Sequence, residues 1–167
     1  MIRDYNEQDK SDVIEIIRLN TPKFFHSSEE KDFIHYLENR IEEFYVIEFK
    51  SNIIGCGGIN YLLNERIVKI SWDMFHPNFQ NKGLGTSFVK YRINRIKKNK
   101  NKNDIVDVVV RTCQLTYRFY EKMGFKLKRV EKDFFAEGFD LYFMTMKINN
   151  IYKNKLYEFE YLSTKEK

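Results

Sequence analysis

The sequence predicts an α/β fold built on a mixed, mostly antiparallel sheet. Segments with the two-residue periodicity of strands alternate with segments of helical periodicity. Their order is strand, two helices, three strands, helix, strand, helix and two strands. The strand–helix–strand unit at residues 66–110 requires a parallel crossover within an otherwise antiparallel arrangement.

The first third of the chain predicts one short strand and two helices. Residues 2–5 are expected to form the strand. Apolar residues at helical spacing then predict a helix that ends at Pro22. A second helix follows, because Ser27 and Glu30 match a capping box in front of an apolar stripe.

The middle of the chain predicts three strands and the longest helix. Residues 44–49 and 52–63 form a strand pair around a turn at 50–52, and residues 66–75 form the next strand. Glycines within the second strand of the pair indicate a bulge or a close backbone approach. The helix that opens near Gly83 is expected to run to about Lys98, with a wide apolar face.

The remaining elements are a buried strand, a short helix and a strand pair. Residues 104–110 are rich in β-branched side chains, as expected for a strand covered on both faces. Residues 114–123 predict a helix that stops at Gly124, a suitable residue for the position after a helix. Residues 125–135 and 139–148 alternate like antiparallel strands.

Length and composition predict one domain over residues 1–148 and an extension, 149–167, whose structure the sequence leaves open. The excess of 29 basic over 24 acidic residues is modest and does not require nucleic acid. Two cysteines and three scattered histidines give neither a disulfide framework nor metal-ligand spacing. The sequence therefore predicts no metal site. The charged amino terminus and the lack of a long apolar run predict a cytoplasmic protein without a membrane segment.

Residues 80–85, Gln-Asn-Lys-Gly-Leu-Gly, follow a predicted strand and open a helix that has no acidic residue in its first turn. The missing side chains of Gly83 and Gly85 let several backbone N–H groups converge on one oxyanion. The helix dipole and Lys82 add positive charge. The P-loop and dinucleotide-binding patterns do not fit this spacing. The alternative is an ordinary left-handed turn followed by a weakly capped helix.

This Q-x-x-G-x-G loop resembles the acyl-CoA pyrophosphate loop of the GNAT superfamily of N-acetyltransferases. A second segment, residues 112–126, resembles the family's segment in which a tyrosine is followed closely by Gly-Phe. The resemblance spans roughly residues 2–147 and implies the GNAT fold, a sheet of about six or seven strands with helices on both faces. It also implies that acetyl-CoA binds at Met74, Phe75, Gln80, Asn81, Lys82, Gly83, Leu84, Gly85, Thr86 and Cys113.

Transfer of an acetyl group to an amine needs a proton acceptor for the amine and a donor for the leaving thiolate. The resemblance points to Tyr120 as the acid. The same residue is expected to pack against Phe125 in a Schellman cap, and both roles can hold at once.

The base is less well defined. Val108 stands where some members of the family carry a glutamate. Asp73, a carboxylate in an otherwise apolar strand, is the candidate for the base. The alternative is that Asp73 serves only as a hydrogen-bond acceptor at the end of the strand. His76 is a third option, although its place beside Pro77 favours a turn.

The leading interpretation is an acetyl-CoA-dependent N-acetyltransferase that acts on a primary amine of a small molecule or peptide. A catalytically silent acyl-CoA sensor with the same fold is the second. The basic run at residues 92–103 is explained by the helix dipole and a solvated loop, which makes a nucleic-acid partner remote. Arg118 and Lys122 are placed to meet the 3′-phosphate of coenzyme A. Residues 20–33 would shape the acceptor site, and a homodimer is compatible with the sequence.

Overall fold

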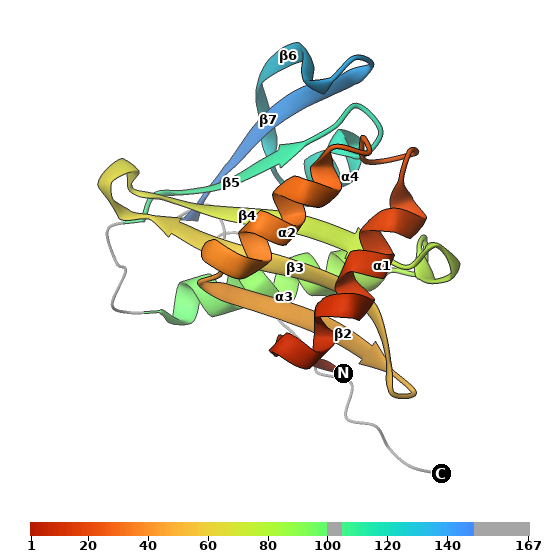
Figure 1. The fold of residues 1–167 in the computed structure, drawn as a ribbon. Coiled ribbons are helices and arrows are strands. Elements are labelled where there is room, and N and C mark those ends of the chain that lie inside the picture. Colours follow the sequence, from red (N-terminus) through yellow and green to blue (C-terminus); the bar gives the residue numbers. More distant parts are fainter. Residues whose placement is uncertain (100–104, 149–167) are drawn as a thin grey trace.

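The computed structural model describes residues 1–99 and 105–148, and both the end of the basic run and the extension 149–167 lie outside these residues. A seven-stranded sheet forms the centre of the molecule (Figure 1). Its strands are β1 (Ile2–Asp4), β2 (Glu43–Phe49), β3 (Asn52–Leu62), β4 (Ile67–Phe75), β5 (Asp107–Thr112), β6 (Lys126–Ala136) and β7 (Phe139–Lys147). The α-helices are α1 (Lys10–Asn20), α2 (Glu29–Asn39), α3 (Leu84–Lys98) and α4 (Tyr117–Lys122), with 3₁₀ turns η1 (Glu7–Asp9), η2 (Leu63–Glu65) and η3 (Pro77–Phe79).

The strands lie in the order β1-β2-β3-β4-β5-β7-β6. Only β4 and β5 pair in parallel, and α3 connects them. Every other neighbouring pair is antiparallel. The mixed sheet and its single crossover are therefore confirmed.

Helices cover both faces of the sheet (Figure 1). One apolar cluster packs α1 and α2 against β2, β3 and β4, around Phe33 and Met74. A larger cluster packs α3 and α4 against the opposite face, around Phe88 and Val108. None of the helices in the described part of the chain is long and apolar enough to cross a lipid bilayer.

The parallel pairing of β4 and β5 covers only part of β4. It runs from Ile67 opposite Asp107 to Ile70 opposite Val110. The register of β4 against β3 shifts at Gly58, and Trp72 has a φ of 57°, so a bulge lies in this half of β4. The last residues of β4 thus separate from β5. The bulge also changes which side chains of β4 face each layer of helices.

The start of α2 differs from the prediction. The capping box of Ser27 and Glu30 does not form, because the helix begins at Glu29. Instead, the backbone N–H of His26 donates to Glu29 Oε1 at 2.9 Å, the same type of contact one residue earlier. Glu30 turns toward α1, where it accepts from Arg18 Nη2 at 2.6 Å. The competing ion pair explains why the sequence pattern misplaced the cap.

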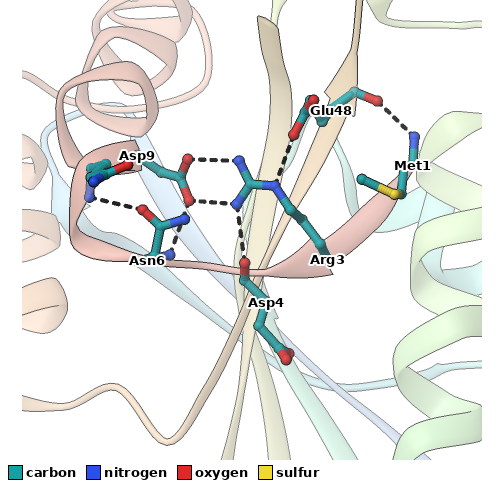
Figure 2. A network of polar contacts seen from close by, with 7 residues as sticks. Met1, Arg3, Asp4, Asn6, Asp9 and Glu48 are labelled. Atoms are coloured by element: carbon teal, nitrogen blue, oxygen red, sulfur yellow. Dashed lines mark hydrogen bonds and ion pairs between the residues drawn. The ribbon is translucent and has the colours of Figure 1, made fainter. Parts of the chain in front are cut away.

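A polar network fastens the first strand to the rest of the sheet (Figure 2). Arg3 donates to both carboxylate oxygens of Asp9, at 2.7 and 2.8 Å, and to Glu48 Oε2 at 2.8 Å. The backbone N–H of Asn6 also donates to Asp9, at 2.9 Å. The hydrogen bonds from Arg3 hold the pKa of the Asp9 carboxyl below its ordinary value.

Candidate active site

The start of α3 presents backbone donors without acceptors. Gly83 occupies the N-cap position with a φ of 79°, and no side chain caps the helix. The first helical hydrogen bond runs from the Ser87 N–H to the Gly83 carbonyl, at 3.1 Å. The N–H groups of Leu84, Gly85 and Thr86 thus have no acceptor within residues 1–99 and 105–148. This geometry suits an anionic ligand.

Glycine suits the two positions of the loop, Gly83 and Gly85, for different physical reasons. At Gly83 the positive φ favours glycine, and a Cβ there would meet no atom within 4 Å. At Gly85 the neighbouring helix α4 is close, since a Cβ would lie 3.3 Å from the Phe119 ring. The loop is therefore open toward solvent at Gly83 and packed at Gly85.

The side chain of Gln80, which the sequence assigned to cofactor binding, is used within the protein. Its Nε2 donates to Asn20 Oδ1 at 2.7 Å and to the Phe75 carbonyl at 3.0 Å. Asn20 is buried and donates to the same carbonyl, also at 3.0 Å. Gln80 thereby ties the loop to the end of α1 and the end of β4. Lys82 lies nearby, with its Nζ 5.4 Å from the centroid of the Phe79 ring.

Asp73 and Tyr120, the two predicted catalytic residues, lie in direct contact. The Tyr120 hydroxyl donates to Asp73 Oδ2 at 2.6 Å. The other oxygen of Asp73 forms an ion pair with Arg92 Nη1. Burial raises the pKa of Tyr120 well above its ordinary value, and the charge of Asp73 raises it further. The hydroxyl thus keeps its proton and acts as a hydrogen-bond donor.

Arg92 is the functional residue that the sequence analysis missed. It belongs to the basic run assigned to a solvated surface, yet its side chain is 0% exposed. Its guanidinium lies 4.3 Å from the centroid of the Phe88 ring and donates from Nη1 to the Gly58 carbonyl at 3.2 Å. The available signal was helical spacing, because Arg92 follows Phe88 by four residues and precedes Ile96 by four on the apolar face of α3.

A glycine on β3 makes room for this ion pair. A Cβ at Gly57 would lie 2.6 Å from Asp73 Oδ1 and 2.8 Å from Arg92 Nη1. Any side chain at this position would displace one of the two groups. The close approach predicted from the glycine-rich strand is confirmed at Gly57, and the predicted bulge lies in the pairing of β3 with β2, where the register shifts between Gly55 and Ile53.

The Schellman cap at the end of α4 is also confirmed. The Phe125 N–H donates to the Tyr120 carbonyl at 3.0 Å, and the Gly124 N–H donates to the Glu121 carbonyl at 2.9 Å. The Tyr120 and Phe125 rings meet edge to face at 5.6 Å. The backbone and ring of Tyr120 therefore close the helix while its hydroxyl contacts Asp73. The helix itself starts at Tyr117, three residues later than predicted.

The other candidates have ordinary structural roles. Cys113 is buried, and its Sγ lies 3.5 Å from Thr116 Oγ1. His76 Nδ1 accepts the Asn78 N–H at 3.2 Å, which is a turn contact. Val108 packs in the apolar core, so no carboxylate occupies that position of β5.

Comparison with known proteins agrees with this geometry. The sequence profile of the Acetyltransferase (GNAT) domain matches residues 40–127, more than half of the chain. The chain belongs to the GNAT acetyltransferase family. This family consists of acetyl-CoA-dependent transferases, and the matched residues of this GNAT domain include Asp73, Arg92, Tyr120 and the loop at the start of α3. No curated protein sequence matches the chain.

Solved structures show the same fold. The ribosomal-protein-S18-alanine N-acetyltransferase from Escherichia coli has a TM-score of 0.70 and 15% identity, over 89% of this GNAT chain and 93% of that one. An aminoglycoside 6′-N-acetyltransferase complexed with coenzyme A has a TM-score of 0.69 and 14% identity, over 89% and 97%. A Salmonella typhimurium protein solved with its cofactor acetyl-CoA has a TM-score of 0.68 and 17% identity, over 89% and 93%. At these identities the likeness establishes the fold.

Proposed function

We propose that the protein is an N-acetyltransferase that moves the acetyl group of acetyl-CoA directly to a primary amine of a small molecule or peptide. The observation that carries this proposal is the set of N–H groups at Leu84, Gly85 and Thr86 that have no acceptor within the described residues. Family membership and the coenzyme A complexes of structural neighbours support the same cofactor.

We assign the diphosphate of acetyl-CoA to the loop of residues 80–86. The free N–H groups would bind its oxygens, and Lys82 would add a full positive charge. The backbone of Met74 and Phe75, where β4 separates from β5, would hold the pantetheine arm. Buried Cys113 would line the same path from the start of the α4 segment.

Tyr120 is assigned to the leaving group. A thiol has a pKa of about 8.5, so the thiolate of coenzyme A is a fair leaving group that needs only modest stabilisation. In this structure the one Tyr120 O–H points to Asp73 Oδ2, so the hydroxyl would have to turn from Asp73 to donate a hydrogen bond to the thiolate. Because the pKa of Tyr120 is raised well above its ordinary value, the hydroxyl would keep its proton while doing so. The proton required for the released thiol would come from the attacking amine, whose nitrogen loses one proton as the amide forms, directly or through water.

Asp73 is assigned a positioning role. Its oxygens are occupied by the Tyr120 hydroxyl and the Arg92 guanidinium, so neither faces an incoming amine freely. The carboxylate holds the Tyr120 side chain in place before the cofactor binds, and Arg92 holds the carboxylate. The general-base role predicted from the sequence stays an untested prediction, and the variant Asp73→Asn with a full pH profile tests it.

The silent acyl-CoA sensor is the second candidate, because Val108 is apolar where some members of the family carry a glutamate, and the one carboxylate of β5, Asp107, is bound by Lys147 at 2.7 Å. Two measurements separate the candidates. Calorimetric titration with acetyl-CoA measures binding. Release of the coenzyme A thiol in the presence of each amine in a panel measures turnover. We expect both signals, with binding weakened by Lys82→Gln and unaffected by the exposed control Lys31→Gln. Tight binding without turnover of any amine would indicate the sensor, and no binding would rule out both candidates.

A further inference from the structure

Two basic side chains lie on the sheet face that carries α1 and α2, beside the place where β4 and β5 separate. Lys69 of β4 is paired with Val109 of β5, and Arg111 follows two residues later on the same face. Within the described residues neither Lys69 nor Arg111 forms an ion pair. Glu131 acts electrostatically on Arg111, but its carboxylate is already bound by Arg129 at 2.7 Å. Glu65 acts electrostatically on Lys69 without a direct ion pair, so neither cation is paired by contact among the described residues.

Figure 1 shows α1 and α2 crossing the β2, β3 and β4 part of this face, with β5, β7 and β6 beyond them. Two aromatic side chains of β6 lie next to Arg111. Its guanidinium lies 4.7 Å from the centroid of Phe134 and 5.8 Å from that of Phe135. The rings of His26 and Phe139 meet at 5.8 Å, so the α1–α2 linker touches the β6–β7 turn. Arg111 and the linker thus both contact the β6–β7 hairpin, and Lys69 lies within electrostatic range of Arg111, so we treat them as the border of one surface.

The same surface adjoins the cluster of Asp73, Arg92 and Tyr120. The linker residue Phe25 stacks on Trp72 with ring centroids 6.3 Å apart. Trp72 is the bulge residue directly before Asp73 in β4. An acceptor bound over this face would therefore approach the thioester from the side opposite α3 and Tyr120.

We propose that Lys69 and Arg111 bind a carboxylate of the acceptor, so that the substrate is a carboxylate-bearing amine such as an amino acid or an acidic peptide. This inference rests on the proposed function. Two of the three acids in the first turn of α2 that could attract a cationic amine are already engaged, Glu30 by Arg18 and Glu29 by the His26 N–H. Only Asp32 of this turn is left, so Lys69 and Arg111 outweigh it.

The two cations would also assist the reaction itself. A fixed positive charge near an ammonium disfavours its charged form and lowers its pKa. Lys69 is an example, because burial and the charges of Arg111 and Arg40 lower its pKa against the opposing charge of Glu65. A bound amine beside the same charges would lose its proton more easily, which suits a site without a carboxylate at Val108.

A binding experiment tests this inference independently of turnover. Calorimetric titrations into the protein saturated with coenzyme A would compare 4-aminobutyrate, butylamine and 1,4-diaminobutane, which share one chain length and differ in charge. A second arm would compare tripeptides that differ only by glutamate or glutamine, and so distinguishes peptides from free amino acids. We expect at least one ligand with a carboxylate to bind about tenfold more tightly than the matched ligand without it, as for charge-assisted hydrogen bonds.

Variants give the matched controls. Arg111→Gln should remove the preference, Arg111→Lys should retain most of it, and Arg111→Glu should reverse it in favour of the diamine. Lys69→Met should weaken carboxylate binding, whereas the exposed control Lys126→Gln should leave it unchanged. No carboxylate preference in either arm, or a preference that survives Arg111→Gln, overturns the inference. Carboxylate-selective binding without thiol release for any amine would refute the proposed catalysis and leave the binding assignment standing.

Discussion

Two arginine–aspartate pairs in this molecule both have a largely buried carboxylate, but they differ in the exposure and pairing of the arginine. Arg3 and Asp9 form a bidentate contact at the edge of the sheet, and Glu48 accepts the remaining Arg3 Nε–H (Figure 2). Arg92 and Asp73 lie inside the protein, where Arg92 Nε and Nη2 have no hydrogen-bond partner in the described part of the chain. Edge charges that are fully paired contribute to attachment, whereas buried charges with unpaired atoms cost free energy. We infer that the inner pair is kept for the chemistry of Tyr120.

The largest contrast is expected when each arginine is removed. Arg92→Met leaves Asp73 buried without its counter-charge, so the free energy of unfolding should fall by about 3–5 kcal/mol. Arg3→Met also leaves a buried carboxylate, but Asp9 keeps the Asn6 N–H as a donor and Arg3 is partly exposed, so a smaller loss of about 1–3 kcal/mol is expected. Urea unfolding of the two variants measures both effects.

The control for this contrast is the double variant Arg92→Met with Asp73→Asn. It removes both buried charges and should regain most of the lost stability, since the cost comes from the unpaired carboxylate. Equal losses for Arg3→Met and Arg92→Met would show that the two pairs are energetically alike and would remove the basis of the comparison.

The next effect concerns the hydroxyl that the inner pair positions. Tyr120→Phe keeps the ring of the Schellman cap and removes the hydrogen bond to Asp73, so kcat should fall about 100-fold. The Kd for acetyl-CoA should stay unchanged. Tyr117→Phe, on the same helix, is the matched control and should retain activity. Steady-state thiol release checks both variants, and full activity of Tyr120→Phe would exclude a role for the hydroxyl.

The comparison also explains which parts of the molecule could be predicted from sequence. Strand and helix order follow from local periodicity, and the cap at Gly124 follows from local turn chemistry, so both were predicted correctly. The Arg92–Asp73 pair joins α3 to β4, and its burial depends on the missing side chain of Gly57 on a third element. No local pattern records such a contact. A basic residue in a basic run was therefore interpreted as solvated, although its spacing from Phe88 placed it on the apolar face.

Gly57→Ala tests the space that the inner pair needs. The added methyl group would lie 2.6 Å from Asp73 Oδ1, closer than real contacts allow, so the ion pair must shift. Overpacking of this kind costs about 1–3 kcal/mol. We expect reduced kcat together with lower stability in urea. Gly138→Ala is a control without crowding, because a Cβ there meets no atom within 4 Å, and it should lose stability through its positive φ while retaining kcat. Unchanged kcat in Gly57→Ala would show that the position of Asp73 is not critical.

The smallest expected effect is a difference in pH dependence between the two networks. The pKa of Asp9 is lowered in the folded state, so its contribution is complete above about pH 4, the unfolded value, and is lost as the pH falls through the folded pKa. The pKa of Tyr120 is raised, so its contribution is complete below about pH 10 and is lost as the pH rises toward the folded pKa.

Urea midpoints across pH should therefore show that Asp9→Asn flattens only the acid limb and Tyr120→Phe only the alkaline limb. Tyr36, whose pKa burial raises to about 12, retains part of the alkaline limb in both variants. If Tyr120→Phe instead altered the acid limb, the assignment of the alkaline limb to the Tyr120 hydroxyl would be wrong. The inner network would then depend on pH in the same way as the edge network around Asp9.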